Sequence, residues 1–233
     1  MKNLFHTLLI LAFLLLIFIG QTNAQRTINP EPFDGIYVTG NIEVKLEQGE
    51  ENKIELYVDG MPYEKISVKV QRGVLRLRVL ESWLYRDEVI KAYITYKGLN
   101  TVRANAGATV ESEDLISTDN FEVKATSGAR IELSIEVRAV DGGASEGGIL
   151  VLEGTAQEQD LQVSTGGEYD GLDLDCTRTY IRANTGGKAS VVALEHLEAA
   201  ANTGGSIRYK GNPETTRVKT VIAGEVHQIG SMN

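Results

Sequence analysis

The sequence has few of the side chains that bind metals or form disulfides: three histidines and one cysteine among 233 residues. So few soft ligands argue against a zinc cluster or an iron–sulfur site, and a single thiol excludes an intrachain disulfide. Cys176 shares the parity of Leu172 and Leu174, which predicts a buried, inert thiol rather than a reactive one. We expect no metal and no cofactor.

Positive charge is also scarce. The 23 lysines and arginines are outnumbered by 32 aspartates and glutamates, and the formal net charge is −9. Affinity for nucleic-acid phosphates and for anionic lipid surfaces depends on a surplus of basic side chains. The charge therefore argues against a nucleic-acid partner and against adsorption to an anionic membrane surface.

One long apolar run lies near the beginning of the chain. Lys2 precedes the 12 residues Leu8–Ile19, and Thr22 and Ala24 then supply small side chains at the −3 and −1 positions of a signal-peptidase site. The run is well short of the ~20 residues that span a bilayer. We predict a cleaved signal peptide and an exported product in the periplasm, at the cell surface or outside the cell. The alternative is an uncleaved membrane anchor.

After the signal peptide the pattern is that of β-strands. From Phe33 onward apolar and polar residues alternate, as in half-buried strands, and Arg72-Gly73 predicts a tight hairpin turn. Residues 191–201 have a composition that favours helix, but their place in the repeat described below predicts strand.

The second half of the chain repeats a four-residue pattern: a small polar residue, any residue, Gly, then Gly or Ala. The mean step is about 20 residues, which suits one turn of a β-helix and is too short for a propeller blade. The uneven spacing around residues 141–164 predicts a bulged or looped turn, and residues 222–225 form a degraded last copy. The predicted corner glycines are Gly107, Gly128, Gly143, Gly166, Gly186, Gly204 and Gly224.

The interior of this solenoid is predicted to be narrow. Within residues 121–139 the apolar side chains share one parity and the charged ones the other, and many of the inward residues are alanines. Small stacked side chains leave no internal pocket for a cofactor. The predicted segments are a signal peptide (1–24), a leader (25–32), an N-terminal β segment continuous with the solenoid (33–100) and β-helix rungs with glycine corners (101–230).

Three features together resemble a known family of exported bacterial proteins. They are the opening Phe33-Asp-Gly-Ile-Tyr-Val-Thr-Gly-Asn-Ile-Glu-Val-Lys-Leu46, the later Gly73-Val-Leu-Arg-Leu77, and the repeated corners. The sequence is similar, over about residues 33–230, to the head GIN domain family labelled putative auto-transporter adhesins, which is frequent in Bacteroidetes. The resemblance implies a right-handed parallel β-helix, a cell-envelope location and a role in adhesion. It supplies no catalytic residues.

Two sets of outward side chains are candidate binding residues. The corner side chains would form a polar ladder that binds a sugar polymer, or would satisfy backbone groups at each bend. A basic stripe lies two residues before the corners and would hold an anionic glycan, or pair with Glu122 and Glu198 across rungs. The ladder is Asn105, Thr126, Ser164, Asn184 and Asn202, and the stripe is Arg103, Lys124 and Arg182.

Two further groups are candidates of a different kind. Trp83 and Tyr85 would stack on sugar rings or anchor a protein partner, or would cover one end of the solenoid. Asp170, Asp173 and Asp175 would bind calcium or cleave a polysaccharide, or would form a solvated acidic edge.

These observations leave three functions open. The first is a non-enzymatic exported adhesin that binds a glycan or an envelope protein through its outer surface. The second is a polysaccharide-degrading β-helix enzyme, which needs long loops to wall a groove, and only residues 82–87 and 141–148 are candidates for such loops. The third is a structural component that associates with its own copies through the open solenoid ends. The shortage of loops favours binding over cleavage.

Overall fold

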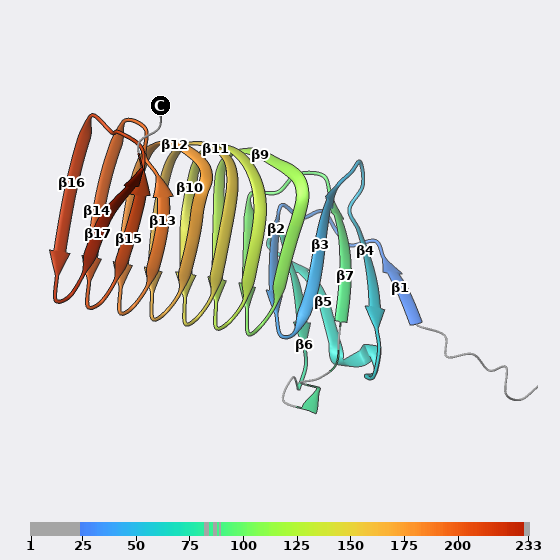
Figure 1. Cartoon of the computed structure of the whole chain (residues 1–233). Coiled ribbons are helices and arrows are strands. Elements are labelled where there is room, and N and C mark those ends of the chain that lie inside the picture. Colours follow the sequence, from blue (N-terminus) through green and yellow to red (C-terminus); the bar gives the residue numbers. More distant parts are fainter. Residues whose placement is uncertain (1–23, 82–83, 86–87, 89, 231–233) are drawn as a thin grey trace, which may run out of the picture.

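The computed structural model describes residues 24–81, 84–85, 88 and 90–230. Within these residues the chain forms 17 β-strands and one short 3-10 helix, η1 (Tyr63–Lys65). The strands wind into coils that stack into a rod, with tight turns along one edge and smooth arches along the other (Figure 1). This confirms the predicted all-β fold, a parallel β-helix with a β-rich N-terminal part.

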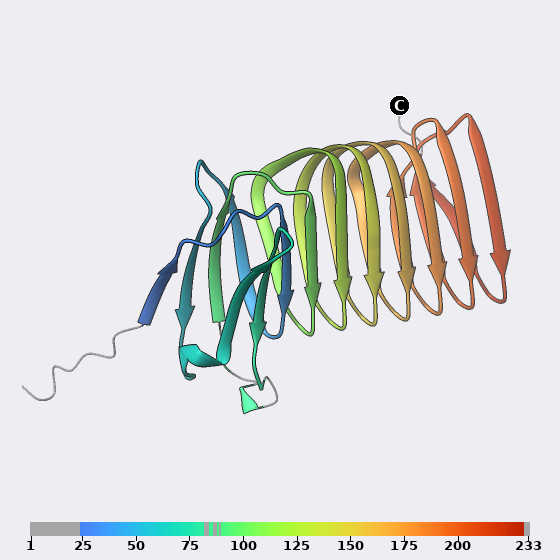
Figure 2. The same ribbon diagram turned by 180° about the vertical axis from the view of Figure 1, so that it is seen from behind.

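Each coil has two straight sides, which we call wall A and wall B. Wall A carries the strand segments that lead into the tight turns, and wall B carries those that leave them (Figure 2). In spatial order, wall A contains β5 (Ile66–Gln71), β6 (Val74–Val79), β2 (Gly35–Thr39), β8 (Thr101–Asn105), the second parts of β9 (Thr109–Thr126), β10 (Arg130–Ser145), β11 (Ile149–Ser164) and β12 (Glu168–Asn184), then β14 (His196–Asn202) and β16 (Thr215–Val221). Wall B contains β1 (Ala24–Ile28), β4 (Lys53–Val58), β7 (Ile90–Tyr96), β3 (Ile42–Gln48), the first parts of β9 to β12, then β13 (Lys188–Val192), β15 (Ser206–Lys210) and β17 (Glu225–Gly230).

The N-terminal end of the rod is closed by antiparallel strands. β4 pairs with β7, β1 pairs with β4, and β5 forms a hairpin with β6 through the predicted turn at Arg72-Gly73. Part of the segment predicted as a leader, residues 25–32, thus belongs to β1. The inward side chains Ile54 and Leu56 of β4 are fully buried, so this end of the core is covered.

The tight turns are four-residue corners with two left-handed residues in the middle. In one of them Thr165 (φ 51°) and Gly166 (φ 69°) hold these positions, and Gly167 N donates to Ser164 O at 2.9 Å, as in a type I′ turn. Gly166 N also donates to Thr185 O of the next coil at 3.1 Å, so the corners are hydrogen-bonded to one another. Seven corners share this pattern, with Gly107, Gly128, Gly147, Gly166, Gly186, Gly204 and Ala223 at the third position.

The third corner is not where the spacing predicted it. Gly143 lies inside β10, and the corner is formed by Glu146 (φ 53°) and Gly147 (φ 74°). Corner glycines then recur every 18 to 21 residues, and the corner in residues 141–164 is an ordinary one instead of the predicted bulged or looped turn. The irregularity in this range lies in a strand, where the register between β11 and β12 shifts between Val151 and Glu153. The reason is that Ser145-Glu-Gly-Gly148 fits the corner pattern too, at the more regular spacing.

The last corner keeps its shape with a different sequence. Ile222 (φ 45°) and Ala223 (φ 57°) occupy the left-handed positions without glycine. Gly224, predicted as the corner glycine, is the residue after the turn, and its N–H donates to Val221 O at 3.2 Å. A Cβ at Gly224 would lie 2.0 Å from the carbonyl oxygen of Ala201 in the preceding coil, so close packing of neighbouring coils requires this glycine.

A narrow core fills the space between the walls. One inward column of wall A is at most 2% exposed and consists mainly of alanines, as predicted: Val38, Ala104, Ala125, Ala144, Val163, Ala183 and Ala201. The helix-favouring segment 191–201 is divided between β13 and β14, which confirms the strand prediction because the repeat register overrides local propensity.

One buried polar cluster interrupts the apolar core. Gln159 Nε2 donates to Thr179 Oγ1 at 2.8 Å, and the Tyr169 hydroxyl donates to Gln159 Oε1 at 2.9 Å. Thr179 Oγ1 in turn donates to the carbonyl of Val192 at 2.7 Å. Because three neighbouring coils share these bonds, the cluster stabilises their register.

Candidate ligand-binding groove on wall A

The predicted polar ladder is a true column of the structure. Strand register places its six members on successive coils of wall A, each half-buried at the first residue of a corner: Asn105, Thr126, Ser145, Ser164, Asn184 and Asn202. Ser145 was missed because the third corner was misplaced. Asn202 Nδ2 donates to Asn184 Oδ1 at 2.9 Å, and Thr126 Oγ1 donates to the carbonyl of Ala104 at 3.4 Å. At these two places the ladder satisfies its own polar groups.

The predicted basic stripe forms the next outward column, but its arginines are neutralised. Arg103 pairs with Glu122 at 2.5 Å, one of the two carboxylates predicted as partners of the stripe, and Arg182 pairs with Asp160 at 2.8 Å, which was not among them. Across the described ranges Lys124 has no acidic partner within 4.0 Å. The stripe therefore presents one unpaired cation and two ion pairs.

A groove opens where these two columns meet the middle of wall A. Its volume is about 320 Å³. We call it the wall A groove. Its lining combines basic, acidic, amide and hydroxyl side chains on a floor of small residues: Lys124, Asp141, Gly142, Gly143, Ala144, Ser145, Asp160, Gln162, Ser164 and Arg182.

Gly143 creates this hollow. In the stripe column Gly143 stands between Lys124 and Gln162, so a side chain is missing where the neighbouring coils have one. A Cβ at Gly143 would lie 1.8 Å from the carbonyl oxygen of Gln162, and its φ of 142° is strained for residues with a side chain. The backbone itself therefore keeps the floor of the groove open.

The groove continues toward the arched edge of the rod. A second hollow of about 680 Å³ shares Asp141 and Asp160 with it and extends past Glu122 and Glu158. Tyr180 follows Asp160 on the next coil of the same column, and its ring centroid lies 5.4 Å from that of His196. An aromatic face thus stands beside a surface rich in hydrogen-bonding groups.

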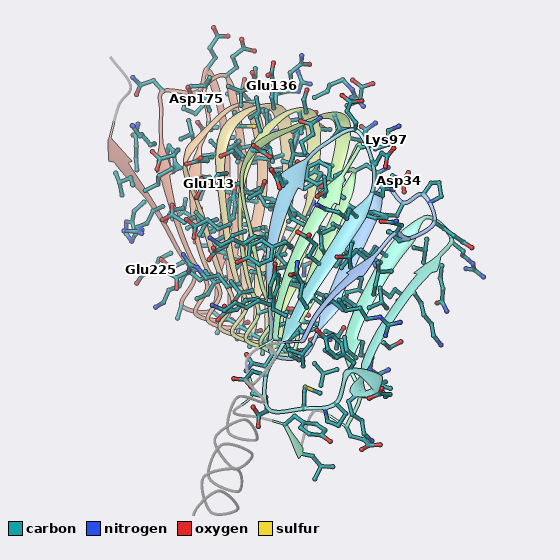
Figure 3. All side chains as sticks on the ribbon, turned by 90° about the vertical axis from the view of Figure 1, so that its right-hand side faces the viewer. Asp34, Lys97, Glu113, Glu136, Asp175 and Glu225 are labelled. Atoms are coloured by element: carbon teal, nitrogen blue, oxygen red, sulfur yellow. The ribbon has the colours of Figure 1, made fainter. Side chains whose placement is uncertain are left out.

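The other predicted site residues lie apart from the groove. Asp170, Asp173 and Asp175 are exposed on β12, and Asp175 projects at the arched edge with Glu136 (Figure 3). No group of three or more His, Cys, Asp and Glu side chains in the described part of the chain is placed to hold a metal ion. Trp83 lies outside the described residues, while Tyr85 is partly buried against the core.

Two further observations bear on chemistry. Cys176 is fully buried, and burial raises the pKa of its thiol to about 11, which agrees with the predicted inert cysteine. Residues 141–148, considered as a groove-walling loop, are instead the end of β10 and a tight corner.

In the described residues, no helix has the length and apolar character needed to cross a membrane.

Comparison with known proteins gives a consistent result. Residues 32–213 match the family described as "Putative auto-transporter adhesin, head GIN domain". A putative adhesin from Bacteroides fragilis has a similar structure, with a TM-score of 0.77, 22% identity and coverage of 90% of this chain and 96% of that one. No curated protein matches the sequence.

Two Parabacteroides structures are also similar. A putative adhesin from Parabacteroides merdae has a TM-score of 0.69 at 20% identity, and a putative lipid binding protein from Parabacteroides distasonis has a TM-score of 0.67 at 17% identity. In both cases 90% of this chain and 98% of the other are covered. At these identities the likeness shows a shared fold.

Proposed function

Because this chain belongs to the head GIN domain family of putative auto-transporter adhesins, we propose that it is an exported, non-enzymatic surface protein that binds a saccharide through the wall A groove. The observation that carries the proposal is a hollow in wall A whose floor is the backbone of Gly143, where a side chain cannot be accommodated. The family supports the surface role, and the groove supports the choice of ligand.

The side chains of the groove suit a hydroxyl-rich ligand. Sugar hydroxyls both donate and accept hydrogen bonds, and the lining offers donors on Lys124 and Gln162 and acceptors on Asp141, with hydroxyls on Ser145 and Ser164. Rungs about 4.8 Å apart repeat these groups along the rod. A polymer lying across several coils would meet similar groups at each step.

The charges favour a neutral saccharide over an anionic one. The stripe arginines Arg103 and Arg182 are paired with carboxylates, and the unpaired Lys124 shares the groove with Asp141, which has no basic partner within 4.0 Å across the described ranges. The stripe therefore lacks the excess positive charge that would attract a polyanion.

Binding of the exported protein to neutral and uronic-acid-containing polysaccharides, measured on an array and then by calorimetry, tests the proposal. Gln162→Trp should fill the groove and abolish binding. Lys124→Ala should weaken binding about tenfold or more, because a charge-assisted hydrogen bond contributes roughly 1.5–3 kcal/mol. Lys188→Ala, an exposed lysine on wall B, is the matched control and should bind like the wild type.

Two results would overturn the proposal. If Gln162→Trp binds as well as the wild type while keeping its strand spectrum by circular dichroism, the ligand does not occupy the groove. If any bound polysaccharide is cleaved, the protein is an enzyme, and the adjacent carboxylates Asp141 and Asp160 become the first candidates for its catalytic groups.

A further inference from the structure

The two ends of the rod differ. At the N-terminal end antiparallel strands cover the core. At the C-terminal end, within the part of the chain that the structure describes, β16 pairs only with β14 and β17 only with β15. All seven residues of β16 are exposed, whereas the inward residues that precede them on β14, Leu197, Ala199 and Ala201, are buried. Val218 is 49% exposed, and its predecessors Ala199 and Ile181 are each 1% exposed. The core therefore opens at this end (Figure 1).

Apolar side chains gather at the open end. Among the described residues, nine large hydrophobic side chains are exposed, and four of them belong to the last coil: Val218, Val221, Ile222 and Ile229. Both strands also present an unpaired backbone edge there. An exposed edge with apolar neighbours is a surface on which a further strand can pair.

We propose that this end is the interface of a symmetric dimer, in which β16 of each copy pairs antiparallel with β17 of the other copy. β16 and β17 run in opposite directions because a tight corner joins them. A twofold axis parallel to the strands keeps these directions and brings β16 beside the other copy's β17. Each copy then closes the core of the other.

Charge distinguishes this arrangement from the alternative. β16 carries Arg217 and Lys219 on its outer face, and β17 carries Glu225, which lies 3.4 Å from His227 of its own strand. In the alternative arrangement, β16 would pair with β16 of the second copy. Arg217 and Lys219 would then face Arg217 and Lys219 of that copy, and like charges on opposite strands destabilise a strand pair. Pairing β16 with β17 brings Lys219 near Glu225, since Lys219 lies near the end of β16 and Glu225 begins β17, on either side of the corner.

The size of the end is sufficient for association. Seven residues of strand span about 23 Å, which is the length of the end face. The two walls lie about 10 Å apart, and the side chains on their outer faces widen the end face to about 20 Å, so each copy offers a footprint of about 500 Å². The total of about 1,000 Å² is at the lower limit of specific interfaces, and ladder hydrogen bonds add to it. Because a twofold contact uses the same surface on both copies, it closes at two copies and does not extend into a fibre.

Sedimentation velocity of the exported protein, from micromolar to submillimolar concentrations, tests the dimer. The wild type should change from monomer to dimer as its concentration rises through this range. Lys219→Glu and Glu225→Lys should each raise the dissociation constant about tenfold or more, and the double charge swap should restore it to within about threefold. Lys188→Glu on wall B is the control and should leave the dissociation constant unchanged.

Each other outcome contradicts the proposal. A wild type that stays monomeric throughout this range shows that Arg217 and Lys219 protect the edge instead of serving an interface. A dimer that the single charge reversals leave intact, with unchanged circular dichroism, uses another surface. Saccharide binding by the monomeric variants is expected to persist, so failure of the dimer and failure of the proposed function are separable.

Discussion

Replacing Gly143 by alanine should destabilise the protein far more than replacing Gly147. Sequence spacing favoured Gly143 as the corner glycine, whereas the structure puts the corner at Gly147. At Gly147 a Cβ has open space around it and only the left-handed φ of 74° opposes it. For residues other than glycine this conformation costs about 1–2 kcal/mol.

At Gly143 the obstacle is a neighbouring strand. The added Cβ would lie 1.8 Å from the carbonyl oxygen of Gln162, so β11 must move by more than 1 Å to reach the 3.0 Å that real Cβ contacts require. Such a shift breaks one or two ladder hydrogen bonds at about 0.5–1.5 kcal/mol each, in addition to overpacking of about 1–3 kcal/mol. We expect a loss of about 3–5 kcal/mol for Gly143→Ala.

Urea unfolding followed by circular dichroism measures both variants. Gly166→Ala, at a corner with a similar φ of 69° and open space, is the control and should match Gly147→Ala. If Gly143→Ala proves as mild as Gly147→Ala, Gly143 occupies an open turn, and both the corner assignment and the glycine floor of the groove are wrong.

Three further results are expected. In the folded protein Cys176 should resist a thiol reagent at pH 8 and react once urea unfolds the chain, because burial raises its pKa to about 11. Because the pKa of Cys176 is about 11 in the folded protein and 9.0 ordinarily, the fold loses stability as the pH rises from about 9 to 11, and this loss should be absent in Cys176→Ala. Burial also raises the pKa of Tyr169 above its ordinary 10.0, so both proteins should lose further stability above about pH 10. Gln159→Ala should destabilise by about 2–4 kcal/mol in urea unfolding, because it leaves the Tyr169 hydroxyl without its buried partner, while the exposed Gln157→Ala should be nearly neutral.

The coiled fold could be predicted from the sequence because its determinants are periodic. Alternation identifies strands, and glycine at steps of about 20 residues identifies coils. The same regularity contained the signal that was missed: Gly128, Gly147 and Gly166 are evenly spaced, and Gly143 is not. Local motif matching favoured Gly143 because two glycine pairs stand close together in residues 142–148.

The groove could be predicted only in part. The ladder and the stripe follow from strand parity, which places Lys124, Ser164 and Arg182 on the outer face of wall A, where they line the groove. The pairing of Arg182 with Asp160 depends on which carboxylate lies closer across coils, and sequence distance does not reveal it. The hollow itself arises at Gly143, which has no side chain, whereas the residues at the same position of the neighbouring strands, Lys124 and Gln162, have long ones.

Hydrogen–deuterium exchange of the purified protein, with and without a saccharide that it binds, shows which wall the ligand contacts. If the saccharide occupies the wall A groove, exchange should slow in residues 141–145 and 160–164, which contribute to its lining, and should stay unchanged across wall B. Protection confined to wall B or to the acidic residues 170–175, with residues 141–145 unaffected, would contradict binding in the wall A groove.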